Sequence, residues 1–180
     1  MTRAFVAVRP PDTVLDEIDM LSTTLELGDA RRTTRDQWHV TLQFLGNRAD
    51  IDAVTDALQG LRVPAGRAQL GGLGAFPSAK RARVVWLGLV EGGEMFGALA
   101  HEIGERLTPL GHAPEERAYH AHLTIARLKT PADVRPTLEA DAGGVGEAWP
   151  VDEVTVYESQ LRRTGAEYLP RAAVALGSQG

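Results

Sequence analysis

The fold is decided by residues 38–45, Trp-His-Val-Thr-Leu-Gln-Phe-Leu, and the rest of the chain is arranged around this stretch. Side chains alternate between the two faces of a β-strand, so His39 and Thr41 project from one face. Val40 and Leu42 project from the other. The alternation therefore predicts a strand with one chemically active face and one face packed in a core.

A second stretch repeats this arrangement. Residues 119–127 have the sequence Tyr-His-Ala-His-Leu-Thr-Ile-Ala-Arg, and His122 lies 83 residues after His39, close to half of the 180-residue chain. His122 and Thr124 share one strand face, with apolar side chains behind them. Two His-x-Thr segments at this separation indicate a duplicated unit, in which each half offers an imidazole and a hydroxyl on a sheet face.

The remaining segments alternate between strand and helix patterns. Apolar residues at helical spacing predict helices, and short apolar runs or period-two alternation predict strands. We expect strands at 3–8, 38–45, 67–73, 83–90, 119–127, 151–157 and 167–176, and helices from Asp12 or Thr13 to Gly28, at 50–61, from Met95 to near Gly111, and in a short or broken form around Pro136. Gly143, Gly144 and Gly146 predict a loop, and the tail from Gly177 is expected to be frayed.

The strand lengths and the half-exposed alternation favour sheets with one solvated face over a doubly wound parallel sheet. We therefore predict an α+β fold of two similar lobes, each an antiparallel sheet backed by helices. The C-terminal strands are expected to cross back and complete the first lobe, so residues 1–180 form one bilobal domain without a clean internal boundary. Pro170 predicts that the last strand lies at a sheet edge or carries a bulge.

The composition excludes several classes of protein. Hydrophobic residues make up 43% of the chain and charged residues 24%, which is ordinary for a soluble globular protein. No apolar run approaches the roughly 20 residues needed to cross a bilayer, and we expect a cytoplasmic protein without membrane association. The absence of cysteine excludes disulfides, thiolate nucleophiles and Cys-ligated zinc.

Positive charge is grouped near the two His-x-Thr segments, although the formal net charge is −5. The net charge argues against a protein that coats long nucleic acid, because such binding needs a basic surface. The grouped cations can instead focus a positive field into a cleft that accepts a short anionic end, or they are solvated loop residues. The groups are Arg31, Arg32 and Arg35, then Lys80, Arg81 and Arg83, and then Arg117, Arg127 and Lys129.

The two segments and their surroundings resemble a known family. Trp-His-Val-Thr-Leu-Gln-Phe-Leu-Gly at 38–46 and His-Leu-Thr-Ile-Ala-Arg at 122–127 look like the paired signatures of the 2H phosphoesterase superfamily. Further segments narrow the resemblance to its RNA 2′,3′-cyclic phosphodiesterase branch, also called 2′-5′ RNA ligase. One departure is Ala121, where family members commonly have proline. The further segments are 3–8, Phe76-Pro77, 83–88 and 156–159, followed by Gly165 and Tyr168.

The resemblance implies an active site in a groove between two pseudo-twofold lobes, with no metal ion and no cofactor. It implies that His39 and His122 open a 2′,3′-cyclic phosphate: a neutral imidazole takes a proton from water, and an imidazolium protonates the leaving alkoxide. On this basis His39 is the acid, His122 is the base and the product is a 2′-phosphomonoester. The expected partners are RNA ends or nucleotides that carry the cyclic phosphate, and the protein is expected to be a monomer.

Four further residues are expected to bind the substrate. The hydroxyls of Thr41 and Thr124 can donate to the non-bridging phosphate oxygens, and Arg127 can contact the phosphate or the RNA backbone. Strict alternation places Arg127 on the wrong face, five residues after His122, so the strand must end or bulge before it. The resemblance suggests that Phe44, at the equivalent position of the first segment, stacks on a base; core packing is the alternative.

Other interpretations stay open from the sequence. His120 shares a face with His122, which allows a metal site, but no further ligand lies at suitable local spacing. The same catalytic groups, acting on a cut RNA, can join its halves as a 2′-5′ RNA ligase. A non-catalytic RNA-end or nucleotide-binding protein would also keep the groove. Structural roles are expected for Trp38, Trp86, Trp149, Tyr157 and Ser159.

Overall fold

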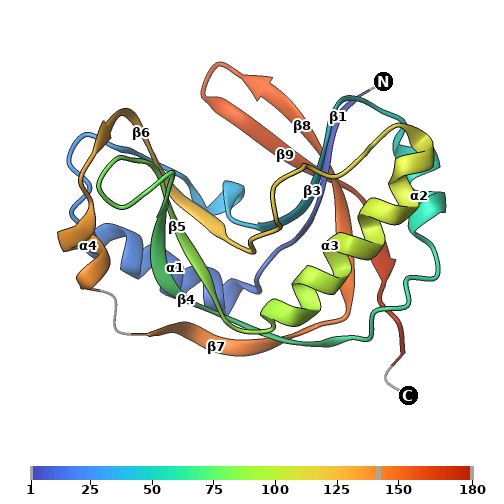
Figure 1. Ribbon diagram of the computed structural model, residues 1–180, viewed down its shortest axis with the longest axis horizontal. Helices are drawn as coiled ribbons and strands as arrows, with labels where there is room; N and C mark the ends of the chain where they lie inside the picture. The colour runs from blue at the N-terminus through green and yellow to red at the C-terminus, as the bar shows by residue number, and fades with distance from the viewer. Residues whose placement is uncertain (1, 141–142, 179–180) are drawn as a thin grey trace.

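Two antiparallel sheets form the two lobes of the molecule (Figure 1). The computed structural model describes residues 2–140 and 143–178, and its sheets have the strand orders β3-β1-β8-β9 and β2-β6-β5-β4-β7. The first sheet contains β1 (Thr2–Val8), β3 (Val40–Ala49), β8 (Glu153–Arg162) and β9 (Gly165–Ala175). The second contains β2 (Arg31–Arg32), β4 (Gly66–Phe76), β5 (Ala82–Glu91), β6 (Leu123–Ala132) and β7 (Gly144–Val151).

The first long helix of each lobe packs against the sheet of the other lobe. Helix α1 follows β1 of the first sheet but contacts β7 of the second, and α3 follows β5 of the second sheet but contacts β3 of the first, beside α2. No helix in the described part of the chain is both long enough and apolar enough to span a bilayer. The helices are α1 (Asp12–Thr24), α2 (Ile51–Leu58), α3 (Gly93–Leu107) and α4 (Arg135–Glu139), with 3₁₀ turns η1 (Arg35–Gln37) and η2 (Thr108–Leu110).

A shared hydrophobic core joins the two lobes. One cluster of buried side chains draws on both sheets and on the long helices, and it includes Trp38, Leu70 and Phe96. On β1, Val6 lies in this core, whereas Phe5 belongs to a small separate cluster. Because neighbouring side chains of a strand point to opposite faces, Phe5 marks the face of the first sheet that is turned away from the core.

The predicted α+β class with two antiparallel lobes is confirmed. The C-terminal strands cross back as expected, because β8 pairs with β1 in the first sheet. Strand β2, from the first half of the chain, crosses in the other direction and pairs with β6. Pro170 lies on β9 at the edge of the first sheet, where its missing N–H removes no bond to a further strand.

The predicted loop at the glycine-rich segment 143–146 was wrong, because this segment enters strand β7. Leu70 pairs with Val145, and Gly71 pairs with Gly144. A Cβ on Gly71 would lie 2.7 Å from the carbonyl oxygen of Gly143, so the two strands approach more closely than side chains allow. Glycine here serves close packing, whereas the sequence indicated flexibility. The predicted strand at 151–157 is in consequence divided between β7 and β8.

Two predictions about segment ends also need correction. The backbone of Gly177 is held rather than frayed, since its N–H donates to the Val63 carbonyl at 2.8 Å and its carbonyl accepts from Ala65 at 3.0 Å. Residues 179–180 of the tail lie outside the described residues. Helix α1 begins at Asp12, as predicted, but it ends at Thr24 instead of continuing to Gly28.

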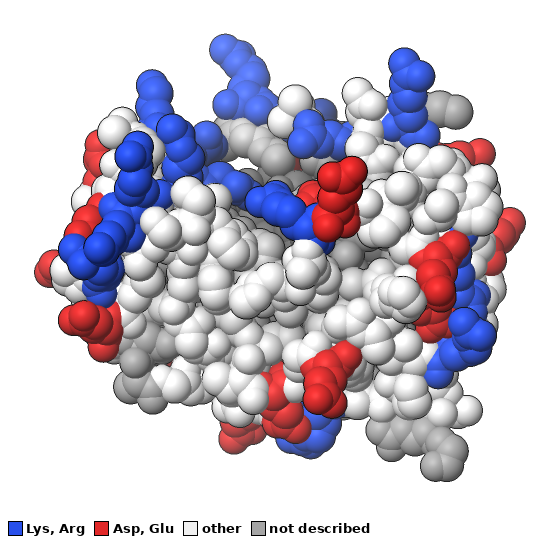
Figure 2. Space-filling view, in the orientation of Figure 1, with Lys and Arg blue, Asp and Glu red and all other residues white. Residues whose placement is uncertain are grey.

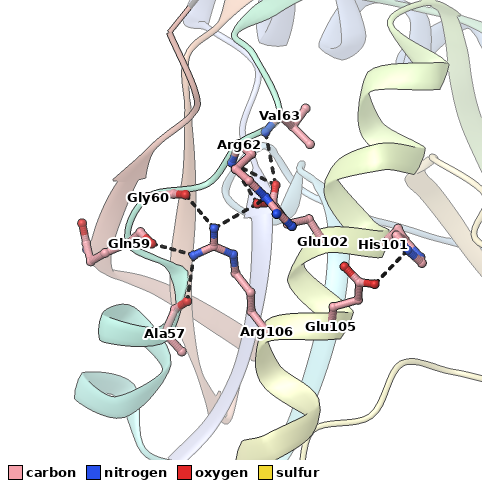
Figure 3. Close-up of polar contacts among 9 residues, drawn as sticks. All are labelled: Ala57, Gln59, Gly60, Arg62, Val63, His101, Glu102, Glu105 and Arg106. Carbon is pink, nitrogen blue, oxygen red and sulfur yellow. Dashed lines mark hydrogen bonds and ion pairs between the residues drawn. The ribbon is translucent and has the colours of Figure 1, made fainter.

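A buried carboxylate fixes α3 to the segment after α2 (Figure 3). Glu102 is 5% exposed and accepts from the backbone N–H of Arg62 at 2.8 Å and of Val63 at 3.2 Å. Burial raises the pKa of Glu102, but these bonds and Arg106 outweigh burial, so the net pKa lies below its ordinary value. Arg106 donates to Glu102 and to the carbonyls of Ala57, Gln59 and Gly60.

Candidate active site

The two signature strands, β3 and β6, have the same irregularity at the same place. The register with the neighbouring strand shifts at Leu42 in β3 and at Ile125 in β6. On both sides of this shift, buried and exposed residues follow one another in the same order in the two strands. Such a bulge reverses the alternation of side chains. Phe44 and Arg127 therefore return to the face of the preceding histidine. Strict alternation would have placed Arg127 on the opposite face, and the bulge removes this difficulty.

His39 stands one residue before β3 and is enclosed by aromatic rings. Its imidazole stacks on Phe5, with ring centroids 4.7 Å apart, and meets the edge of Tyr168 at 5.1 Å. Burial lowers the pKa of His39 to about 4, against the effect of a backbone hydrogen bond to Gln37. The protein surroundings therefore favour a neutral ring at pH 7.

His122 stands one residue before β6 and has an equivalent backbone bond. Its Nδ1 lies 2.7 Å from the carbonyl oxygen of His120. A carbonyl can only accept, so Nδ1 carries the hydrogen and Nε2 keeps a lone pair that can take a proton. Phe76 presents its edge to the ring at 5.1 Å. Burial lowers the pKa of His122, and the positive charge of Arg127 lowers it further.

The side chains of the predicted site are brought together in one cleft of about 920 Å³. Arg127, and His122 when it is protonated, each lower the pKa of His39, so the three groups lie near enough to interact in this cleft. Phe44 is 61% exposed, so the alternative of core packing does not hold for it. All six predicted residues line the cleft: His39, Thr41, Phe44, His122, Thr124 and Arg127.

The donors that face the cleft are available to a ligand. Within residues 2–140 and 143–178, the hydroxyls of Thr41 and Thr124 have no hydrogen-bond partner and Arg127 forms no ion pair. Arg31 is the cross-strand partner of Arg127 and lines the same cleft. Figure 2 shows Lys and Arg side chains gathered along the upper edge of the molecule, around a hollow in its surface. The cleft is therefore suited to an anion.

Helix α3 forms another wall of the cleft. His101 and Glu105 line it and approach each other at 3.3 Å, and Figure 3 shows them on the side of α3 away from Arg106. The contacts of Glu102 and Arg106 on one side of the helix thus fix which residues its other side presents to the cleft.

Two hydrogen-bonded bridges connect the signature segments, and the sequence did not reveal them. Tyr119 donates its hydroxyl proton to the carbonyl of Thr41 at 2.9 Å. The Trp38 indole donates to the hydroxyl of Thr33 at 2.8 Å, which in turn donates to the carbonyl of Thr124 at 2.7 Å. Each bridge joins the surroundings of one histidine to the strand of the other. No local pattern signals them, because the bonds that cross between the segments join residues 78 and 91 positions apart.

The other aromatic and histidine residues have mainly structural contacts. Trp38 and Trp149 are buried, as predicted, and Tyr157 stacks on Phe5 behind His39. Trp86 packs edge-on against His120. Among the described residues, no three His, Cys, Asp or Glu side chains are grouped so that they could hold a metal ion.

Comparisons with known proteins agree with this geometry. A model of the 2′-5′ RNA ligase superfamily matches residues 10–163. The chain is 33% identical over 160 residues to the RNA 2′,3′-cyclic phosphodiesterase of Aeropyrum pernix, which covers 85% of this chain and 90% of that protein. It is 31% identical over 181 residues to the protein of the same name from Methanothermobacter thermautotrophicus, covering 92% and 94%. A solved structure described as a phosphoesterase superposes with a TM-score of 0.82 at 25% identity, covering 99% of both chains.

Proposed function

The chain belongs to the 2′-5′ RNA ligase superfamily, and we propose that it hydrolyses RNA 2′,3′-cyclic phosphate ends to 2′-phosphomonoesters without a metal ion. His39 and His122 act as the acid/base pair. The observation that carries this proposal is that the two histidines, each placed before a strand with the same bulge, line one cleft and interact across it. The relatives from Aeropyrum pernix and Methanothermobacter thermautotrophicus are named RNA 2′,3′-cyclic phosphodiesterases, which supports the same activity.

The proposed reaction divides two proton transfers between the rings. Nε2 of His122 takes a proton from water as the water oxygen bonds to phosphorus, and the bond from phosphorus to O3′ breaks. His39 gives its proton to O3′, which leaves a 3′-hydroxyl and a 2′-phosphate. Solvent then returns the proton from His122 to His39. Each positioned proton-transfer group contributes about 10²–10⁴ in rate.

The remaining polar groups stabilise the charge that builds on the phosphate oxygens. In this proposal, the hydroxyls of Thr41 and Thr124 donate to the non-bridging oxygens, because both line the cleft without another partner in the described residues. Arg127 adds a charge-assisted bond to the same group. Groups that are already oriented toward the developing charge need no reorganisation during the reaction, which is why such donors are effective.

The protonation states of the two histidines have a direct consequence for this mechanism. The protein surroundings favour a neutral His39, since burial lowers its pKa to about 4, yet an acid must carry a proton. A cyclic phosphate brings a negative charge, which favours the protonated form of a nearby imidazole. The phosphate therefore favours a proton on one of the two imidazoles, and the proposed mechanism places it on His39 and keeps His122 neutral as the base.

We further propose that the protein acts as a monomer in the cytoplasm. One chain supplies both histidines, both threonines and the cleft arginines, so no second copy is needed to complete the site.

A rate assay in EDTA with nucleoside 2′,3′-cyclic phosphates tests the proposed function. We expect turnover to a 2′-phosphate, with kcat falling by about 10²–10⁴ in His39→Ala and in His122→Ala. Full activity of both variants, or dependence on added metal, would contradict the mechanism. Parallel incubation with RNA halves measures ligation, and tight binding of a nucleoside 2′-phosphate without any turnover would identify a non-catalytic binder.

A further inference from the structure

Six cationic residues meet at one end of the second sheet, although they come from three separate parts of the sequence. Arg31 on β2 pairs directly with Arg127 on β6, and Arg83 reaches from β5 to the carbonyl of Lys129 at 3.4 Å. Lys80 and Arg81 lie in the turn that leads into β5. We call these residues the basic strip: Arg31, Lys80, Arg81, Arg83, Arg127 and Lys129.

The charge of the basic strip is not compensated within the described chain. None of its six members forms an ion pair in residues 2–140 and 143–178. The acidic group that interacts with Lys80 is Asp133, but its carboxylate is held by Arg135 at 2.6 Å. Arginines in ion pairs lie elsewhere: Arg35, Arg62, Arg106, Arg117, Arg135, Arg162 and Arg171.

Uncompensated cations on this molecule point to an anionic ligand. The chain has a formal net charge of −5, so its average surface repels anions. Like charges gathered on one sheet end also repel one another, which costs stability unless a ligand neutralises them. Figure 2 shows Lys and Arg side chains massed at the upper left, over the region where Figure 1 draws β5 and β6.

The basic strip begins inside the cleft and continues outside it. Arg31 and Arg127 line the cleft, whereas Arg83 and Lys129 do not. Lys129 stands two residues beyond Arg127 on β6, a distance of roughly 7 Å along the strand, and β5 lies about 4.8 Å to the side. A ligand that touches the whole strip must therefore be longer than the group held between the histidines.

We propose that the basic strip binds the phosphate backbone of the RNA strand that leads to the cyclic end, so that the preferred substrate is an oligonucleotide or longer RNA and not a free nucleotide. This inference rests on the proposed function, because the cyclic phosphate places the strand terminus between His39 and His122. The continuity of the strip with the cleft favours RNA over an acidic protein or a membrane surface, since only a polyanion that ends in the cleft contacts both parts.

The experiment compares two substrates with the same terminal nucleotide, a nucleoside 2′,3′-cyclic phosphate and an eight-nucleotide RNA ending in that group. Counterion release gives a slope of about −0.7 in log affinity against log salt for each phosphate contact on a single strand. With three contacts outside the cleft, KM for the RNA should rise about 20-fold more than KM for the nucleotide between 50 and 200 mM salt.

A triple substitution separates the basic strip from the catalytic cleft. We expect Lys80→Ala/Arg83→Ala/Lys129→Ala to raise KM for the RNA and to remove its extra salt dependence, with kcat/KM for the nucleotide unchanged. The control Arg3→Ala/Arg48→Ala/Arg67→Ala makes the same change in net charge with residues outside both the strip and the cleft. The control should leave both substrates unaffected.

The outcomes distinguish the two proposals. Equal KM values and equal salt slopes for both substrates would overturn the basic strip while leaving the proposed function intact, and they would favour a small cyclic ester as substrate. If neither substrate is hydrolysed, the proposed function fails. The strip is then tested alone by fluorescence anisotropy with the RNA ending in a 2′-phosphate, and unchanged affinity in the triple variant would overturn it. Binding of the strip to anionic vesicles or acidic peptide with no preference for RNA would also overturn it.

Discussion

At the scale of residues, the two histidines share a backbone arrangement that selects their chemistry. His122 gives its Nδ1 hydrogen to the carbonyl two residues earlier, and His39 makes a backbone bond to the residue at the same offset. Burial lowers the pKa of both rings, and the charge of Arg127 lowers both further. The protein groups around the cleft therefore favour neutral imidazoles, and a bound anion opposes this preference.

We predict that the pH optimum of kcat/KM lies below that of kcat. The mechanism needs one proton shared between His39 and His122. In the unliganded enzyme, which kcat/KM reports, the lowered pKa values confine this state to acidic pH, and it is lost as the pH rises. In the substrate complex, which kcat reports, the phosphate raises both pKa values and moves the profile upward. Rates measured from about pH 4 to 9 with a nucleoside cyclic phosphate check this.

Arg127 provides the control for this profile. Its charge lowers the pKa of both rings, so Arg127→Gln should move the alkaline limb of kcat/KM to higher pH, whereas Arg48→Gln, outside the cleft lining, should not. Coincident profiles for kcat and kcat/KM would contradict this account of the histidines.

Phe44 tests whether a base stacks in the cleft. We predict that Phe44→Ala raises KM for a nucleoside cyclic phosphate about 5- to 150-fold with little change in kcat, because stacking of a base on an aromatic ring contributes about 1–3 kcal/mol. Leu161 is a suitable control, since it also lines the cleft and is 76% exposed but has no aromatic face. An equal effect of Leu161→Ala in the same steady-state assay would show simple apolar contact instead of stacking.

The sequence predicted the residues whose signal is local. His39 and Thr41 follow from a two-residue spacing that can be seen in the chain itself, and so do their counterparts in the second segment. The sequence showed that the strand must end or bulge for Arg127 to reach the correct face, but it did not show where the bulge lies. Tyr119 and Thr33 could not be found, because their bonding partners lie 78 and 91 residues away.

At the scale of elements, the loop before β6 holds the two signature segments in register. Besides the bond from Tyr119 to Thr41, the amide of Gln43 on β3 donates to the carbonyl of His112 at 2.8 Å. A loop bonded twice to β3 carries the chain directly into His122. The position of the second histidine relative to the first strand is thus set by side-chain bonds as well as by the core.

We predict that Tyr119→Phe lowers kcat/KM several-fold and reduces the free energy of unfolding by about 0.5–1.5 kcal/mol, the usual contribution of one hydrogen bond. The control Tyr157→Phe removes a hydroxyl that interacts with Thr155 on the same strand, so it should leave kcat/KM unchanged. Steady-state kinetics and urea unfolding provide the two measurements. If Tyr119→Phe lost stability but kept full kcat/KM, the bond would not position the site.

The elements that the sequence missed are those specified by pairing across the chain. Strand β7 begins in a glycine-rich segment, and only its close approach to Gly71 of β4 explains why glycine is suited to a strand there. By contrast, α3 and β5 were predicted near their observed bounds, because their apolar periodicity is continuous.

At the scale of the whole molecule, the two halves of the chain exchange elements, so that each sheet is contacted or completed by elements from the other half. Helix α1 contacts the second sheet, α3 contacts the first, and β2 crosses to pair with β6. The duplicated segments predicted two lobes, but an amphipathic helix does not specify which sheet it covers, so the exchange was not predicted. One shared core results, and it holds β3 and β6 so that their active faces line the same cleft.

The central claim is that this arrangement brings His39 and His122 to opposite sides of one phosphate. The most direct measurement is a crystal structure of the protein with a nucleoside 2′-phosphate bound. We predict that one phosphate group lies within about 2.6–3.2 Å of a ring nitrogen of each histidine, with the hydroxyls of Thr41 and Thr124 on its remaining oxygens. A phosphate that contacts only one histidine, or that binds outside their cleft, would contradict the account.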